Sequence, residues 1–272
     1  DPAGADPTPR PEAIHRATAA RPMKGLGGVI VDLGGGQTGF LRAKRPPAPG
    51  RPLMVQISGW AEPGKAPPVG DRLRLKGTGA VLTPGAPGIN VSRSIRDEEA
   101  RAALQALAAE AMAGAEEGLG LILRTRAGVM RDEALREETS GLRADWARLA
   151  AATSGPPACL REGPGAAEAA LREWDGPDTD LVEGADAFGA AGLWEEIEGL
   201  RTPRVPLGAG FMSVEPTREL VAVDVNTGGD LSPAAALKAN LAAHQEFTLI
   251  LGNRLYVMQF GHAIFFNSRS IR

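Results

Sequence analysis

Residues 28–44 read GVIVDLGGGQTGFLRAK, in which two short apolar runs lie on either side of a glycine-rich turn. Similar short runs follow at LMVQISGW (53–60), DRLRLKG (71–77) and GAVLTPG (79–85), with glycine or proline close to each. Short strands at such close spacing, punctuated by turn residues, are typical of a small β-barrel. The sequence therefore predicts a barrel in this part of the chain.

The residues before this barrel, 1–22, are rich in proline and show no strand or helix period. We expect them to form a linker or the remnant of a preceding element. Because the sequence begins with Asp1 rather than methionine, we also expect a piece of a longer protein.

Two helices are predicted after the barrel, with one strand between them. Residues 97–118 are alanine-rich, open with acids and end on a glycine, and residues 132–152 form an amphipathic pattern. The strand GLGLILRTRAG (118–128) carries Arg124 and Thr125 at its end. A guanidinium and a neighbouring hydroxyl together fit a terminal phosphate. An ordinary surface pair at a strand end has the same pattern.

The second half of the chain has an α/β pattern after a glycine- and proline-rich break at 154–165. Its stretch VAVDVNTGGD (221–230) ends an apolar run and leads toward a helix that Ser232 is placed to cap. Asp224 and Asn226 are two residues apart, so they share one face of a strand and present two oxygen ligands suited to Mg²⁺. The alternative is a strand end with an Asx turn before the glycines.

Composition limits the function classes open to the 272-residue chain. The net charge of −3 gives no global basic field for nucleic acid, although a local patch is compatible with it. The single cysteine, Cys159, excludes an internal disulfide framework and a cysteine-rich zinc site within one chain, and it favours the reducing cytoplasm. Apolar runs fall short of the roughly 20 residues that span a bilayer, so no membrane association is expected.

The last 26 residues, 247–272, differ in composition from the rest, since they hold five of the twelve aromatic residues and no Asp, Glu or Pro. FTLIL-GN-RLYVMQF fits a hairpin on a two-residue turn. A reading-frame change, an insertion or a fusion is the other explanation, and we expect this tail to be foreign to the preceding sequence.

These motifs, taken in order, resemble the ribonuclease E/G family of bacterial endoribonucleases over residues 23–243. The resemblance implies an α+β multidomain chain. Its expected parts are an OB-fold RNA-binding barrel (23–82), an RNase H-like/5′-sensor region (83–158) and the first part of a DNase I-like α/β catalytic domain (159–246). The resemblance also implies a hydrolase that cuts single-stranded RNA in RNA processing and decay. The complete protein is compatible with homo-oligomerisation.

The resemblance assigns roles to six residues. Asp224 is implied to bind Mg²⁺ and Asn226 to orient the attacking water. Arg124 and Thr125 are implied to bind the 5′-monophosphate of RNA. Phe40 and Lys65 match RNA-contacting positions of the barrel, and Phe40 is implied to stack on a base.

The sequence also departs from the family pattern. The family's second metal-binding aspartate has no counterpart here, because no Asp follows Asp230. Ile30 stands where many members place a second stacking aromatic. Phe40 itself fits either a stacking residue beside Lys44 and Arg45 or a barrel-core residue. We therefore expect a truncated and impaired endoribonuclease. The alternatives are a non-catalytic binder of single-stranded RNA and a chain that does not fold stably.

Overall fold

The structure is a computed structural model that describes residues 9–62, 64–174, 182, 184–207, 210–216, 220–229, 232–243 and 263–267. The chain divides into two compact units, Asp1–Thr179 and Asp180–Arg272. Both helices and strands occur in each unit, which agrees with the predicted α+β class.

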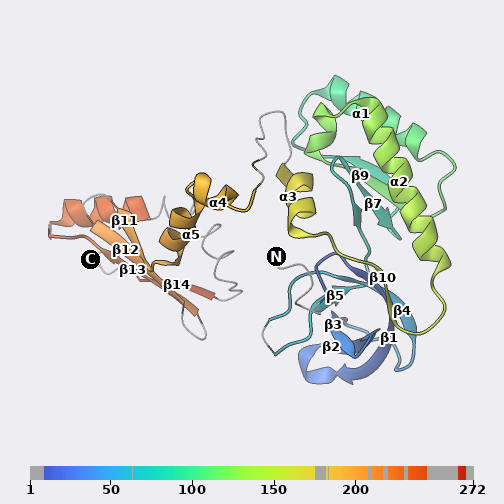
Figure 1. Ribbon diagram of the computed structural model, residues 1–272, viewed down its shortest axis with the longest axis horizontal. Helices are drawn as coiled ribbons and strands as arrows, with labels where there is room; N and C mark the ends of the chain where they lie inside the picture. The colour runs from blue at the N-terminus through green and yellow to red at the C-terminus, as the bar shows by residue number, and fades with distance from the viewer. Residues whose placement is uncertain are drawn as a thin grey trace. The chain divides into compact units, whose positions relative to one another are not determined.

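Five strands of the first unit close into a barrel (Figure 1). They are β1 (Ile14–Met23), β2 (Gly28–Gly34), β3 (Gln37–Arg42), β4 (Pro52–Ile57) and β5 (Pro68–Gly70). The hydrogen-bonded order β1-β2-β3-β5-β4 returns to β1, and only the β3–β5 pair is parallel. A closed five-stranded barrel is consistent with an OB fold. The prediction of a barrel is confirmed.

Strand β1 corrects the expectation that residues 1–22 form a linker. It pairs antiparallel with both β2 and β4, so the barrel closes through it. Its inward positions include Ala17 and Ala19, which are 0% and 2% exposed. Alanine has little strand propensity, so the local sequence gives no strand signal here, and tertiary packing against the barrel interior decides the outcome.

The barrel core follows from the alternation that the sequence shows. Val29, Val31 and Leu33 of β2 are buried at every second position, and Leu41 of β3 joins them. The turn between β2 and β3 needs glycine, because residues 34 to 36 have φ values of 90°, 61° and 80°. The glycines of the opening stretch therefore serve this turn.

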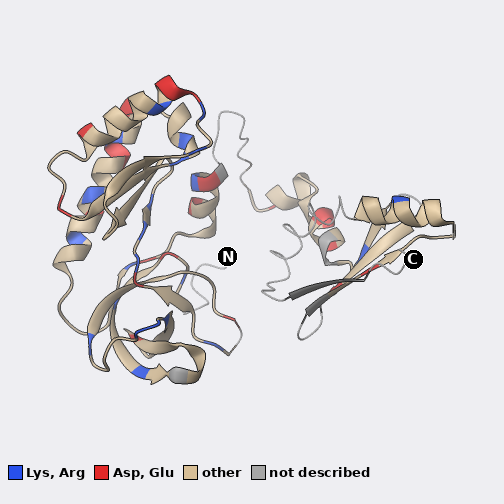
Figure 2. Cartoon of the chain, turned by 180° about the vertical axis from the view of Figure 1, so that it is seen from behind, with Lys and Arg blue, Asp and Glu red and all other residues tan. Residues whose placement is uncertain are grey.

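A second sheet of the first unit has the strand order β6-β7-β9-β8. Its strands are β6 (Leu75–Lys76), β7 (Ala80–Pro84), β8 (Gly88–Val91) and β9 (Leu119–Leu123). The helices that pack on it are α1 (Glu98–Ala111) and α2 (Asp132–Ala151), along which acidic and basic positions are interspersed (Figure 2). The barrel thus ends before residue 82, because β6 and β7 belong to this sheet.

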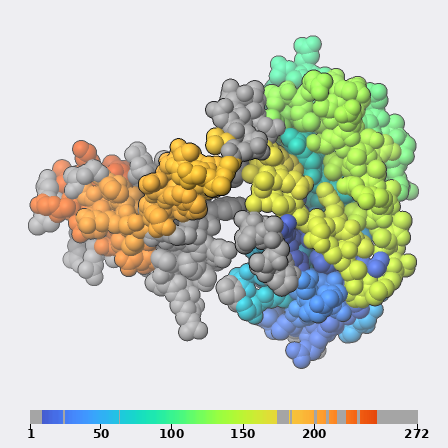
Figure 3. Space-filling model, in the orientation of Figure 1, coloured from blue at the N-terminus to red at the C-terminus, as the bar shows by residue number. Residues whose placement is uncertain are grey.

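Both predicted helices are confirmed, and α1 is shorter than its expected range. Asp97 caps α1 by accepting a hydrogen bond from the Ala100 amide, and the helix ends at Ala111. Strand β10 (Ala158–Arg161) then pairs with β1, and helix α3 (Ala166–Trp174) follows. The yellow segment that contains α3 lies between the helical half and the barrel of this unit (Figure 3).

The second unit contains a four-stranded sheet of order β11-β12-β13-β14. Its elements are α4 (Ala187–Ala190), α5 (Leu193–Arg201), β11 (Arg204–Leu207), β12 (Gly210–Pro216), β13 (Leu220–Asn226) and β14 (Ala263–Asn267). Residues 233–243 are helical, and the Ala235 amide donates to Ser232 Oγ at 3.2 Å, which confirms the predicted cap.

Within the tail, β14 pairs parallel with β13, and Asn267 lies opposite Asp224 in the register. The hairpin considered for residues 247–260 lies outside the described residues. The tail therefore contributes at least one strand to this sheet, whatever its origin.

Candidate phosphate pocket and strand-end carboxylate

Arg124 and Thr125 lie where β9 ends and the short 3-10 helix Thr125–Val129 begins. They line a pocket of about 620 Å³. The other residues that line it are Thr78, Ser92, Ile122, Leu123, Arg126, Val129, Arg172 and Glu173. The structure thus brings the predicted Arg–Thr pair together with five further polar or charged residues of the same unit.

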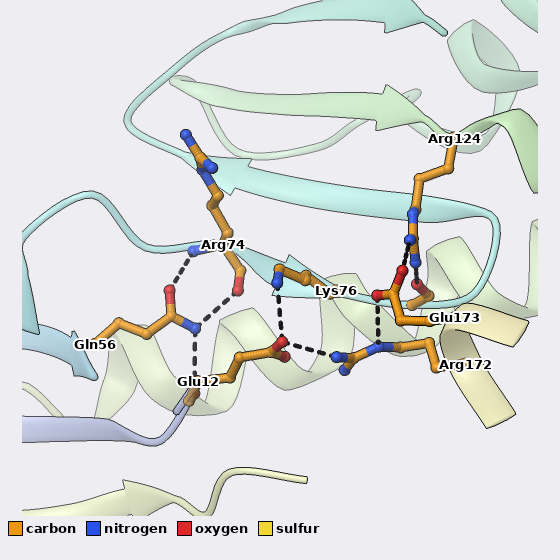
Figure 4. A network of polar contacts seen from close by, with 8 residues as sticks. Glu12, Gln56, Arg74, Lys76, Arg124, Arg172 and Glu173 are labelled. Carbon is orange, nitrogen blue, oxygen red and sulfur yellow. Dashed lines mark hydrogen bonds and ion pairs between the residues drawn. The ribbon is translucent and has the colours of Figure 1, made fainter. Parts of the chain in front are cut away.

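The guanidinium of Arg124 is held from two sides (Figure 4). Its Nη1 donates to the Gly77 carbonyl at 3.1 Å, and its Nη2 donates to the carboxylate of Glu173 on α3. The Arg124 amide also donates to the Gly79 carbonyl at 2.7 Å. These contacts fix the side chain at the pocket wall and leave it one quarter exposed.

Thr125 meets Ser92 across the pocket. The two hydroxyl oxygens, Ser92 Oγ and Thr125 Oγ1, are 2.9 Å apart. A pair of hydroxyls at this distance can share one hydrogen bond and still offer a second donor to a ligand oxygen. Ser92 is therefore a pocket residue for which sequence patterns indicated no role.

Glu138 of α2 supports the segment that holds Arg124. Its two carboxylate oxygens accept hydrogen bonds from the amides of Thr78, Gly79 and Ala80 at 2.8, 2.9 and 2.7 Å. A Cβ at Gly77 would lie only 2.5 Å from the Glu138 carboxyl carbon, so the carboxylate fits closely against this loop. Sequence patterns missed Glu138, because its partners lie about sixty residues earlier in the chain.

The charge state of Glu173 follows from its neighbours. The hydrogen bond from Arg124 lowers the pKa of Glu173 below its ordinary value; burial opposes this, and the charges of Arg124, Arg172 and Lys76 lower the pKa further. The Glu173 carboxylate is therefore ionised at neutral pH and pairs with Arg124 as an anion.

Phe40 lies on the outer face of the barrel. It pairs in register with Ile30, and both side chains are half-buried, whereas the adjacent Val31 and Leu41 point into the core. The Phe40 ring rests over Gly28, where a Cβ would be 2.6 Å from the ring. Phe40 is therefore not a residue of the barrel core, because its position on β3 faces away from the core.

Lys65 lies in the loop between β4 and β5 and pairs with Glu62 at 2.5 Å. Both side chains are more than three-fifths exposed. The loop and the β2–β3 turn line a second pocket of about 520 Å³, which includes Gln37 and Thr38. The two barrel residues predicted to contact RNA are thus on the surface.

Asp224 and Asn226 lie at the end of β13, and both are exposed. Val223, which directly precedes Asp224, is 1% exposed. Asn226 Oδ1 accepts a hydrogen bond from the Gly228 amide at 3.0 Å, so the Asx turn considered as the alternative is present. Among the residues that the structure describes, no three His, Cys, Asp or Glu side chains form a group that could hold a metal.

Residues 74–183, which carry the second sheet and the Arg124 pocket, match the Ribonuclease E/G family. Over this segment the chain is similar to the ribonuclease E/G family. It is 24% identical over 244 residues to Ribonuclease E of Nostoc sp. strain PCC 7120, covering 76% of this chain and 35% of that protein. It is 22% identical over 253 residues to Ribonuclease E of Synechocystis sp. strain PCC 6803, covering 80% of this chain and 37% of that protein.

The chain spans a little over a third of the length of these two curated relatives. The segment matched to the family contains Arg124, Thr125, Glu138 and Glu173, and it precedes Asp224. Within the described part of the chain, no helix has both the length and the apolar character that crossing a membrane requires.

Proposed function

We propose that this chain belongs to an endoribonuclease that hydrolyses single-stranded RNA with Mg²⁺ during RNA processing and decay in the cytoplasm. The observation that carries the proposal is the pocket of Arg124 and Thr125, which lies inside the segment matched to the family. In this proposal the pocket binds the 5′-monophosphate of RNA, and the second unit is the first part of a DNase I-like catalytic domain. The second sheet with α1 and α2 is the RNase H-like region.

The lining of the pocket suits a terminal phosphate. Three arginines and one glutamate line it, so the lining carries more positively than negatively charged side chains. A guanidinium binds two phosphate oxygens at once, and the Thr125 and Ser92 hydroxyls add neutral donors. Ile122 and Val129 are 38% and 72% exposed at the same pocket, where they offer apolar contact to the first nucleotide.

The barrel supplies a second contact with the strand. Phe40 lies on its outer face, where an aromatic ring can stack on an unpaired base, and Lys65 lies in a neighbouring loop. Each base–aromatic stack contributes about 1 to 3 kcal/mol to binding. Ile30 occupies the position paired with Phe40, so this face carries one ring instead of two, and we expect weaker binding.

The residues for a metal are Asp224 and Asn226. Both are exposed at the strand end, which fits Mg²⁺, because this ion binds through one or two carboxylates and keeps several waters. When bound, Mg²⁺ would activate water and neutralise charge on the scissile phosphate. Asp224 is the one carboxylate that the family pattern assigns to the metal in this chain, so we expect slow cleavage. We propose that this chain contains no zinc site. We propose homo-oligomerisation only for the complete protein.

The test uses one single-stranded RNA oligonucleotide, prepared with a 5′-monophosphate or a 5′-hydroxyl, in the presence of Mg²⁺. We expect tighter binding of the monophosphate, slow cleavage, and loss of cleavage with unchanged binding in an Asp224→Asn variant. Arg124→Gln should remove the preference for the monophosphate. Equal binding of both RNAs by the parent chain would contradict the role of the pocket, and binding without cleavage would favour a non-catalytic RNA-binding protein.

A further inference from the structure

The carboxylate of Glu173 forms an ion pair with Arg124, the guanidinium proposed to bind a phosphate. It pairs with Arg124 Nη2, and its other oxygen lies 3.8 Å from Arg172 Nε (Figure 4). Arg124 Nη1 is taken by the Gly77 carbonyl. A phosphate that binds Arg124 Nη2 where Glu173 now binds it must therefore displace this carboxylate.

Glu173 is held in this place by its neighbour in α3. Arg172, whose side chain is 10% exposed, donates from Nη2 to Glu12 Oε1 at 2.7 Å. The same Glu12 oxygen accepts from Lys76 Nζ at 2.9 Å, so one carboxylate next to the barrel anchors both cations. Because Arg172 fixes the end of α3, the side chain of Glu173 is directed to Arg124 rather than to solvent.

The exchange of one anion for another depends on the incoming charge. An internal phosphodiester carries one negative charge, as does the Glu173 carboxylate, so exchanging them at Arg124 brings no gain in charge pairing. A terminal phosphomonoester carries about 1.5 to 2 negative charges at neutral pH and has three acceptor oxygens. It therefore competes better than a diester for the same guanidinium.

We propose that Glu173 is a specificity-determining residue, which makes the Arg124 pocket selective for terminal phosphate over the phosphodiesters within RNA. This inference rests on the proposed 5′-phosphate role of Arg124. Without Glu173, the arginines of the pocket would bind any phosphate of the chain, since a guanidinium does not by itself distinguish a monoester from a diester. With it, singly charged groups are excluded by competition.

The experiment measures the binding of one single-stranded RNA sequence with three 5′ ends at a fixed salt concentration, because such affinities depend strongly on salt. The ends are a monophosphate, its methyl ester, which has one charge, and a hydroxyl. We expect the parent chain to prefer the monophosphate to the methyl ester. In Glu173→Gln the preference should fall about tenfold, mainly through tighter binding of the methyl ester, since a charged hydrogen-bond partner has been removed.

Two further variants make the result specific. Glu168→Gln removes the same charge from an exposed position of α3 and should leave the preference unchanged. Glu173→Asp keeps the charge and should keep part of the preference, which a loss of folding would not do. An unchanged preference in a folded Glu173→Gln protein would overturn the inference and leave the 5′-phosphate role standing. Equal binding of all three ends by the parent chain would overturn both.

Discussion

Arg172 Nη2 donates to Glu12 Oε1 at 2.7 Å, although 160 residues separate the two in the chain. Glu12 precedes the first barrel strand, and Arg172 lies in α3, so this pair joins the barrel to the helix that carries Glu173. Glu12 has a φ of 72°, a region that non-glycine residues rarely adopt. Its contacts with Arg172, Lys76 and the backbone of Ile57 hold it there.

We expect Glu12→Gln to lower the free energy of unfolding of the first unit by about 3 kcal/mol, because removing one partner leaves the nearly buried Arg172 without its anion. Urea unfolding followed by circular dichroism measures this. Glu62→Gln is the control, since the exposed Glu62–Lys65 pair should contribute less than about 1 kcal/mol. Equal losses in the two variants would show that the Glu12 network does not stabilise the fold.

Glu138→Gln should destabilise the first unit by roughly 2 kcal/mol, because an amide has one acceptor oxygen where the carboxylate serves three backbone donors. It should also weaken binding of 5′-monophosphorylated RNA, since the clamped loop holds the carbonyls that position Arg124. Thermal unfolding and RNA titration measure the two effects. Glu137→Gln, an exposed neighbour on the same helix, should change neither.

The stability of the first unit should depend on pH through His15. Burial lowers the pKa of His15, and the hydrogen bond to the Leu33 carbonyl and the charge of Glu162 oppose this only in part. His15 Nδ1 lies 3.2 Å from that carbonyl, and Nε2 is buried without a hydrogen-bond partner in the described structure. The folded imidazole is thus harder to protonate than the unfolded one.

The unfolded chain therefore takes up this proton first as the pH falls. Stability should be full above the unfolded pKa of about 6.5 and decline as the pH drops below it. Unfolding of the parent chain and of His15→Gln between pH 8 and 5 measures this, and the variant should lose less stability over that interval. Parallel pH profiles of the two proteins would contradict the prediction.

Asn267→Asp should strengthen Mg²⁺ binding and raise the rate of RNA cleavage several-fold. Position 267 lies opposite Asp224 in the parallel pairing of β13 and β14, so the change adds a carboxylate at the backbone position that pairs with the proposed metal ligand. Calorimetric titration with Mg²⁺ and a cleavage assay test it. Ser268→Asp adds the same charge one residue later in the chain and serves as the control. Equal gains from both changes would show that the charge, rather than its position, matters.

Elements with local sequence signals could be predicted without knowledge of the fold. The alternation of Val29, Val31 and Leu33 and the glycine turn after them predicted a barrel hairpin, because side chains of a strand alternate between two faces. The cap at Ser232 and the shared strand face of Asp224 and Asn226 were predicted from spacing alone.

Contacts between distant segments could not be predicted from local patterns and became known from the packing of the fold. Strand β1 had no local signal, since alanine fits the barrel interior by its small size and not by strand propensity. Glu173 and Glu138 reach the Arg124 site from helices whose sequences show only helical periodicity. A local pattern specifies which face of an element is buried, whereas the partner of a charged side chain depends on how the elements pack.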